Sequence, residues 1–123
     1  MNDSSFHKLL VDGTPDALVA TAREGEILFW SHGAETTFGY SAAEARGRPI
    51  QDLVLPHESF KVLQEMNAEM RDAGISVYES VRRRKDGQLI NVSTTTRSVN
   101  GEQAGEKWLV THMKDVTRLK ALR

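Results

Sequence analysis

The chain has no cysteine among its 123 residues. Without a thiol it can have no disulfide, no thiolate metal ligand, no cysteine nucleophile and no covalent cysteine-linked chromophore or c-type haem. It also has only three prolines, and no Pro-rich or Gly-rich segment divides it. The length and the absence of a linker therefore predict one ordinary domain.

Long apolar runs and an excess of one charge are missing as well. No run approaches the roughly 20 apolar residues that a membrane-spanning helix needs, and the first residues lack the basic and apolar regions of a secretory signal. Sixteen basic and seventeen acidic residues leave a net charge of −1, which argues against a general nucleic-acid or anionic-membrane binder. We expect a cytoplasmic protein with neither kind of partner.

The N-terminal segment has helical periodicity. Phe6, Leu9 and Leu10 recur at helical spacing before residues 12–15, with the sequence Asp-Gly-Thr-Pro, break the run. This pattern predicts an amphipathic helical extension over residues 1–13.

A hairpin and several short helices are expected next. The apolar runs 17–20 and 27–30 flank a turn-forming cluster at 23–26, and residues 34–38 favour a short helix closed by Gly39. Beyond them, Ser41 and Glu44 have the spacing of a capping box, and the helix they begin should end at Gly47.

The longest predicted helix follows Pro56 and ends at Gly74. Its apolar residues recur every three or four positions on one face: Phe60, Leu63, Met66 and Met70.

The second half of the chain has the composition of strands. Residues 77–84 and 89–99 are rich in valine, threonine and isoleucine and flank the turn sequence Lys-Asp-Gly-Gln at 85–88. A last strand is predicted over 108–116. Two strands, several helices and three strands, in that order, indicate an α+β fold with one antiparallel sheet and helices on one face.

Several motifs then occur in a recognisable order. They are Gly39-Tyr40-Ser41-x-x-Glu44-x-x-Gly47, Leu53 and Pro56, Arg84-Lys85-Asp86-Gly87, and Asp115-Val116-Thr117. Together they resemble the PAS family of sensory modules, and the similarity runs from about Leu9 to Leu119. The resemblance implies a PAS domain over residues 14–117, with the start of a C-terminal signalling helix at 118–123. It also implies a five-stranded antiparallel sheet that encloses a pocket with several short helices and one longer helix.

One local departure concerns the entry to the first helix after the hairpin. The family often has an asparagine after the aromatic residue of the second strand, whereas Trp30 is followed by Ser31-His32-Gly33. Ser31 can cap a helix as asparagine does.

Strand alternation assigns side chains to the pocket if the strands pair as in the family. Leu109, Thr111 and Met113 would then face inward on the last strand, and Trp108, Val110 and His112 outward. The residues predicted to bind a ligand are Tyr78, Ser80, Arg82, Thr94, Thr111 and Met113. Hydroxyls would orient a modest polar ligand and Arg82 would pair with its carboxylate or phosphate. The alternative is that the threonines only favour the strand and that Arg82 pairs with an acidic side chain or turns to solvent.

The sequence does not specify a cofactor. Haem needs an axial imidazole, and among four histidines only His57, at the start of the longest predicted helix, is a candidate. Flavin held without a covalent bond would need an aromatic partner such as Trp30 or Trp108, each of which is better explained as core or interface.

No enzymatic constellation emerges, and no catalytic or metal-binding residue is predicted. No nucleophile occupies a strand–turn–helix elbow, no phosphate-binding glycine loop precedes a helix, and no pair of carboxylates marks a concave site.

The C-terminal residues suggest how a signal would leave the domain. By resemblance, Asp115, Val116 and Thr117 form the exit motif and relay the signal to a C-terminal helix. In the family this helix continues into an effector such as a histidine kinase of a two-component system or a cyclic-dinucleotide enzyme. Leu119 and Leu122, three residues apart, begin such an amphipathic helix.

A homodimer is the partner that the apolar surface favours. The predicted interface residues are Phe6, Leu9, Leu10, Trp108 and Val110. Either the N-terminal helix of the same chain or a second copy would cover the outer sheet face, because buried apolar area stabilises. The sequence thus predicts a non-enzymatic sensory module. The alternative is an interaction and dimerisation module whose pocket is filled by its own side chains.

Overall fold

The computed structural model describes residues 3–55 and 75–122. The helix predicted between Pro56 and Gly74, together with His57, lies outside the described residues.

Five antiparallel strands form one sheet in the spatial order β2-β1-β5-β4-β3. The strands are β1 (Ala17–Ala22), β2 (Ile27–Trp30), β3 (Ile75–Arg83), β4 (Leu89–Asn100) and β5 (Lys107–Asp115). The described helices are α1 (Asp3–Gly13), α2 (His32–Phe38), α3 (Ala42–Ala45), α4 (Ile50–Val54) and α6 (Thr117–Ala121). The predicted α+β fold with a five-stranded antiparallel sheet is confirmed.

The first and last strands meet in the centre of this sheet. β1 pairs with β5 along its whole length, from Ala17 opposite Met113 to Ala22 opposite Trp108. This pairing joins segments that lie far apart in the sequence, so the fold closes only when β5 has been added.

The turn between β3 and β4 forms at the predicted Asp-Gly sequence. The Arg84 amide donates to the Gln88 carbonyl at 2.8 Å, and the Gly87 amide donates to the Arg84 carbonyl at 2.9 Å. The turn fixes the register of the whole hairpin, in which Tyr78 lies opposite Thr94 and Arg82 opposite Ile90.

Helix α2 has a side-chain cap at its start and a glycine at its end. The Ser31 hydroxyl accepts a hydrogen bond from the Ala34 amide at 3.1 Å, as expected for a residue that replaces asparagine. Gly39 ends the helix with φ of 86°, a left-handed conformation that side chains with a Cβ rarely adopt.

Helix α3 begins with the predicted capping box. The Ser41 hydroxyl accepts from the Glu44 amide, and the Glu44 carboxylate accepts from the Ser41 amide. The same carboxylate pairs with Lys85 in the β3–β4 turn, so this capping interaction also ties α3 to the far hairpin.

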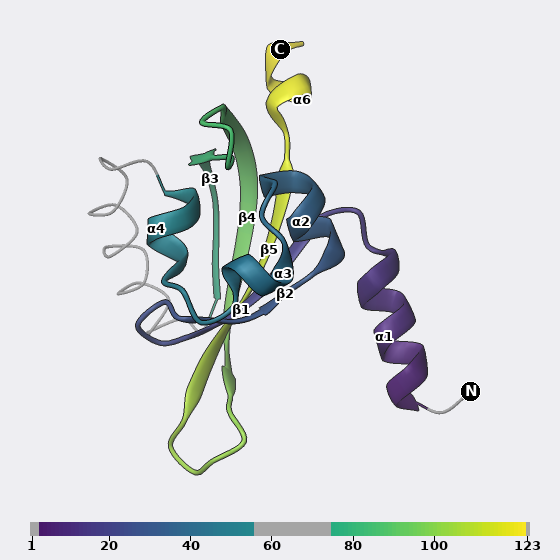
Figure 1. Cartoon of the computed structure of the whole chain (residues 1–123), viewed down its shortest axis with the longest axis vertical. Helices are drawn as coiled ribbons and strands as arrows, with labels where there is room; N and C mark the ends of the chain where they lie inside the picture. Colours follow the sequence, from purple (N-terminus) through teal and green to yellow (C-terminus); the bar gives the residue numbers. More distant parts are fainter. Residues whose placement is uncertain (1–2, 56–74, 123) are drawn as a thin grey trace.

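One face of the sheet carries the core, and α2, α3 and α4 cover it (Figure 1). The burial of side chains alternates along β1 and β4, as period-two strands with one buried face require. The largest side chains in this layer belong to Ile27, Trp30, Phe38 and Leu53.

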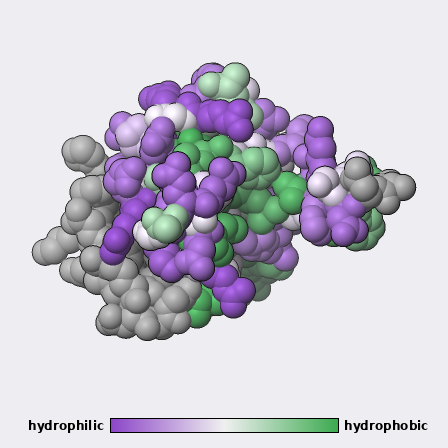
Figure 2. All heavy atoms as spheres, turned by 90° about the horizontal axis from the view of Figure 1, so that it is seen from below, coloured by the Kyte–Doolittle hydropathy of each residue, from purple (hydrophilic) through white to green (hydrophobic). Residues whose placement is uncertain are grey.

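Helix α1 stands away from the sheet and projects from the body of the molecule (Figures 1 and 2). None of its residues is buried, and Phe6, Leu9 and Leu10 are each more than half exposed. On the outer sheet face Val110 is also exposed. Helix α1 therefore does not cover the outer sheet face, and the apolar side chains of both remain in contact with water.

Among the described residues, no helix combines the length and the apolar character that crossing a lipid bilayer demands.

Candidate functional site

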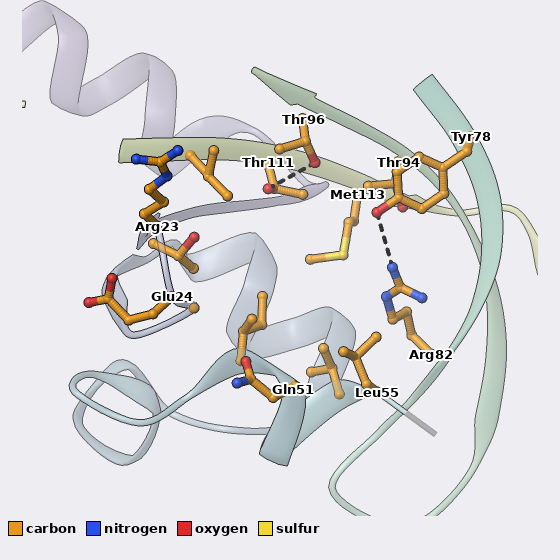
Figure 3. Close-up of a pocket in the computed structure, with 15 residues that line it drawn as sticks. Arg23, Glu24, Gln51, Leu55, Tyr78, Arg82, Thr94, Thr96, Thr111 and Met113 are labelled. Carbon is orange, nitrogen blue, oxygen red and sulfur yellow. Dashed lines mark hydrogen bonds between the residues drawn. The ribbon is translucent and has the colours of Figure 1, made fainter. Parts of the chain in front are cut away.

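A cavity of about 240 Å³ lies between the inner sheet face and helix α4. The β1–β2 turn, α4 and the three strands β3, β4 and β5 contribute its walls (Figure 3). The lining residues are Thr21, Arg23, Glu24, Gly25, Ile50, Gln51, Val54, Leu55, Tyr78, Arg82, Thr94, Thr96, Leu109, Thr111 and Met113.

Arg82 supplies a cation to one end of the cavity. Its side chain extends from β3, and the residue is only 4% exposed. One guanidinium nitrogen donates to the Tyr78 hydroxyl at 3.3 Å and another to the Val81 carbonyl at 3.0 Å. The guanidinium carbon also lies 5.9 Å from the centre of the Tyr78 ring, within the range of a cation–π contact.

The charge of Arg82 is poorly compensated in this position. Burial lowers the pKa of the guanidinium from its ordinary value, and the Tyr78 hydroxyl beside it opposes this shift. An arginine remains protonated at neutral pH, so the cavity contains a positive charge. Within residues 3–55 and 75–122, no carboxylate forms an ion pair with it.

Threonine hydroxyls from two strands line the wall beside Arg82. The hydroxyls of Thr96 on β4 and Thr111 on β5 lie 3.1 Å apart and share a hydrogen bond. The Thr94 hydroxyl is buried without a hydrogen-bond partner in the described part of the chain. A buried polar group of this kind is costly unless a ligand or a water molecule satisfies it.

The turn between β1 and β2 forms the rim at the opposite end of the cavity from Arg82 (Figure 3). Arg23 and Glu24 are exposed there, so their charges are solvated and cancel. Gly25 has φ of 106°, and a Cβ at this position would collide with the Gln51 side chain. The glycine therefore allows the turn to approach α4 and narrow the opening.

Five of the six residues predicted to bind a ligand line this cavity: Tyr78, Arg82, Thr94, Thr111 and Met113. The sixth, Ser80, is not a lining residue. Tyr78 and Arg82 flank it on the same strand face, and the hydrogen bond between their side chains passes across it. Ser80 is thereby separated from the hollow, and its hydroxyl is buried without a partner among the described residues.

Sequence reasoning missed two described segments that contribute to the enclosure. The sequence predicts an apolar run over 17–20 and a turn over 23–26 without assigning either to the pocket, and it does not predict that α4 and Leu55 approach the sheet. The Leu53–Pro56 motif was the one signal near α4. A motif of four residues does not indicate which face of the sheet its side chains will contact, because that depends on the packing of distant segments.

The described residues do not match the needs of haem. No histidine among the cavity-lining residues supplies an axial ligand. His112 lies on β5 with its Nε2 3.0 Å from the Asp16 carboxylate, and the His32 side chain is largely exposed.

Flavin and metal lack support from the same residues. Trp30 packs against Phe38, with 5.7 Å between ring centres, and donates to the Tyr40 carbonyl; neither it nor Trp108 lines the cavity. In the ranges that the structure describes, no cluster of three or more potential ligands is arranged to hold a metal ion.

The end of β5 is tied to the start of β4. The Val116 amide donates to the Asn91 carbonyl, and the Asn91 amide donates to the Thr117 hydroxyl, each at 2.8 Å. The Thr117 hydroxyl in turn donates to Asp115 at 2.6 Å. The predicted exit residues Asp115, Val116 and Thr117 thus form one hydrogen-bonded unit at the point where α6 begins.

Comparison with known proteins agrees with this architecture. A family model described as the PAS fold matches residues 6–114. A search of curated proteins finds no match.

Many solved structures are similar over most of the chain. The crystal structure of a PAS domain from Colwellia psychrerythraea is 25% identical, with a TM-score of 0.85, and the match covers 95% of this chain and 99% of that one. A PAS domain from a two-component sensor histidine kinase is 13% identical, with a TM-score of 0.77 and coverage of 92% and 96%.

A third similar structure contains a small molecule. It is the PAS domain of a LuxR-family transcriptional regulator from Burkholderia thailandensis in complex with ethanol. That domain is 17% identical to this chain, with a TM-score of 0.75 and coverage of 94% and 98%.

Proposed function

Since this chain belongs to the PAS family, a family of sensory and signalling domains, we propose that it binds a small ligand in the cavity beneath α4 and relays occupancy to its C-terminal helix. The observation that carries this proposal is the hollow itself. It contains a buried hydroxyl on Thr94 without a partner among the described residues. Among the described residues, the lining side chains leave this space open, which supports a ligand.

The ligand of a relative supports a small-molecule site. The PAS domain of the Burkholderia relative is in complex with ethanol. This cavity of about 240 Å³ is smaller than sites for drug-sized ligands, which occupy about 300–1,000 Å³. A compact metabolite therefore fits the space better than haem or flavin.

Two short routes connect the cavity to the exit motif. Met113 lines the cavity and lies two residues before Asp115 on the same strand. Arg82 lies opposite Ile90 in the β3–β4 ladder, and the next residue, Asn91, makes hydrogen bonds to the chain at 116 and 117. A ligand that shifts either strand would alter the start of α6.

Helix α6 has a second attachment that such a shift would strain. The Lys120 ammonium lies 3.6 Å from the Glu79 carboxylate on β3. We propose that α6 leads to an effector, such as a histidine kinase or a cyclic-dinucleotide enzyme, and that the cytoplasmic domain itself performs no catalysis. Coupling requires that the ligand bind two arrangements of α6 with different affinity.

Native mass spectrometry of the purified chain tests the binding step. We expect a retained small molecule that is released on denaturation. An empty chain with no bound mass, in which no small molecule raises the melting temperature, would contradict ligand sensing.

Hydrogen exchange tests the relay. Adding the released molecule back to the stripped chain should change amide protection at 115–122, because the hydrogen bonds of Asn91 hold that segment. The matched control is the exposed β4–β5 turn, residues 101–106, where exchange should stay unchanged. Protection confined to the cavity strands would leave binding intact and remove the relay.

A dimer is the second candidate function, and exposed apolar side chains favour it. Phe6, Leu9 and Leu10 on α1 and Val110 on the outer sheet face remain in contact with water, and Trp108 is half-buried on the same strand face as Val110. We propose that a second copy covers these residues, because burying them together stabilises the assembly.

Light scattering after size-exclusion chromatography distinguishes a monomer from a dimer. The native chain should have twice the monomer mass, and Phe6→Glu should halve it. Lys8→Gln on the same helix changes the net charge by the same one unit and is the control. A monomer at high protein concentration would contradict this proposal and leave ligand sensing untouched.

A further inference from the structure

The cavity contains one net positive charge that the described residues do not neutralise. Arg23 and Glu24 are exposed at the rim and have opposite charges, whereas Arg82 is almost fully buried. Taking an ion out of water is unfavourable unless a counter-charge and hydrogen bonds replace its hydration. A ligand with one negative charge would supply both.

The geometry of Arg82 leaves donors for such a ligand. A guanidinium has five N–H groups arranged as a planar fork that suits carboxylates. The described residues accept two hydrogen bonds from it, at the Tyr78 hydroxyl and the Val81 carbonyl. In Figure 3 the side chain of Arg82 points from β3 into the cavity toward Tyr78, with Thr94 close to Tyr78 and Met113 nearby.

The Thr94 hydroxyl is a second polar group in this wall. It is buried on β4, lines the cavity and has no partner among the described residues. A hydroxyl can donate to one carboxylate oxygen while a guanidinium donates to the carboxylate as well. Arg82 and Thr94 thus offer hydrogen-bond donors to the same cavity from adjacent strands, and the Thr96–Thr111 pair lies further along the wall.

The charge balance favours a carboxylate over a phosphate. A phosphate monoester has about 1.5 to 2 negative charges at neutral pH, so a single arginine would leave part of that charge buried and unpaired. A monocarboxylate matches the one cation. Val54, Leu55 and Met113 also line the cavity and offer an apolar surface to the remainder of a short acid.

From these observations we infer that the cavity binds a small monocarboxylate, whose carboxylate pairs with Arg82 and accepts from Thr94 while its short carbon chain contacts Met113 and α4. This inference rests on the proposed ligand-binding function and narrows the chemistry of that ligand.

Calorimetric titration of the dialysed chain at constant ionic strength tests it. The probes are sodium acetate, propionate, butyrate, lactate and pyruvate, with propionamide as the neutral analogue of propionate and inorganic phosphate as the alternative anion. We expect at least one acid to bind, propionamide to bind at least about tenfold more weakly than propionate, and phosphate not to bind.

Two cavity variants and one control identify the contacts. Arg82→Met should weaken binding of the best acid about a hundredfold or more, and Thr94→Val about tenfold. Arg97→Met removes an exposed arginine from β4 and should bind the acid as the native chain does. Thr94→Val keeps the shape of the side chain, so the test remains valid if Arg82→Met does not fold.

Several results would overturn the inference. They are equal affinity for propionamide and propionate, tighter binding of phosphate than of any acid, full affinity in the Arg82→Met variant, or no acid bound at about 10 mM. If the purified chain retains a neutral molecule, the carboxylate is wrong and ligand sensing stands. If it retains nothing and binds no probe, both proposals fail.

Discussion

The inner face of the sheet has two ends that are built from different side chains. At the β2 end, α2 and α3 press Ile27, Trp30 and Phe38 into a filled apolar core. At the other end, under α4 and the β1–β2 turn, the same face carries Arg82 and threonine hydroxyls around a hollow of about 240 Å³ that reaches Thr21 on β1.

The difference separates stability from function. Apolar side chains that fill space contribute transfer free energy and dispersion contacts. A hollow forfeits those contacts, and buried polar groups without partners add a cost. The filled end therefore stabilises a fold that can tolerate an unfavourable cavity at its other end, and a ligand recovers part of that cost when it binds.

Truncating a side chain of the filled core should have the largest effect on stability. Phe38 is completely buried and packs against Trp30, so Phe38→Ala should lower the free energy of unfolding by about 3–5 kcal/mol in denaturant titration. Thr36→Ala, at an exposed position of α2, should change it by less than about 0.5 kcal/mol. A loss below about 1 kcal/mol for Phe38→Ala would mean that the two ends do not differ in packing.

Replacing the buried charge of Arg82 should change the free energy of unfolding in the opposite direction. Arg82→Met removes a buried cation of similar length, so the free energy of unfolding without ligand should rise by about 1–3 kcal/mol. The measurement is denaturant unfolding of the stripped chain. A decrease would show that the contacts of Arg82 with Tyr78 and Val81 outweigh its desolvation, which would make this end a structural site.

Removing the Thr94 hydroxyl should also stabilise the chain without ligand, by a smaller amount. Thr94→Val keeps the shape of the side chain and eliminates a buried group without a described partner. Stability of the stripped chain should rise by about 1 kcal/mol in thermal or chemical unfolding. Thr95→Val, whose side chain faces away from the cavity, is the control, and equal effects for both would indicate only a strand preference for valine.

The smallest effect on stability is expected for the exposed ion pair between Glu44 on α3 and Lys85 in the β3–β4 turn. The side chain of Lys85, then the Ser41 amide, hold the pKa of Glu44 at about 2 instead of its ordinary value of 4.5. A depressed carboxyl pKa stabilises the fold above the unfolded value, and this stabilisation is lost as the pH falls from 4.5 toward 2.

Unfolding at a series of pH values checks this sign. Glu44→Gln should be less stable than the native chain at pH 7, and the difference should vanish as the pH falls to about 2. A difference that persists unchanged at the acid end would assign the effect to the capping box rather than to the charge.

Local signals in the sequence were sufficient for much of this description. The capping box at Ser41 and Glu44, the Asp-Gly turn and the serine cap of α2 all depend on contacts within a few residues, so the residues themselves specify them. Alternation along the strands likewise placed Tyr78, Arg82, Thr111 and Met113 on one face, because the period of a strand is two.

The enclosure of the cavity could not be predicted in the same way. Periodicity states which face of an element a side chain occupies, but not which other element will approach that face. The end of β1, the β1–β2 turn and helix α4 meet around the cavity only through the long-range packing of the folded sheet. Ser80 is separated from the hollow by the Tyr78–Arg82 hydrogen bond.

Neighbouring residues and composition were enough to predict the strands, the capped helices α2 and α3, the strand faces and the absence of cysteine chemistry. The tertiary structure alone decided that one end of the inner face is filled and the other hollow. Packing of distant segments sets how much space remains between them, and no local pattern contains that distance.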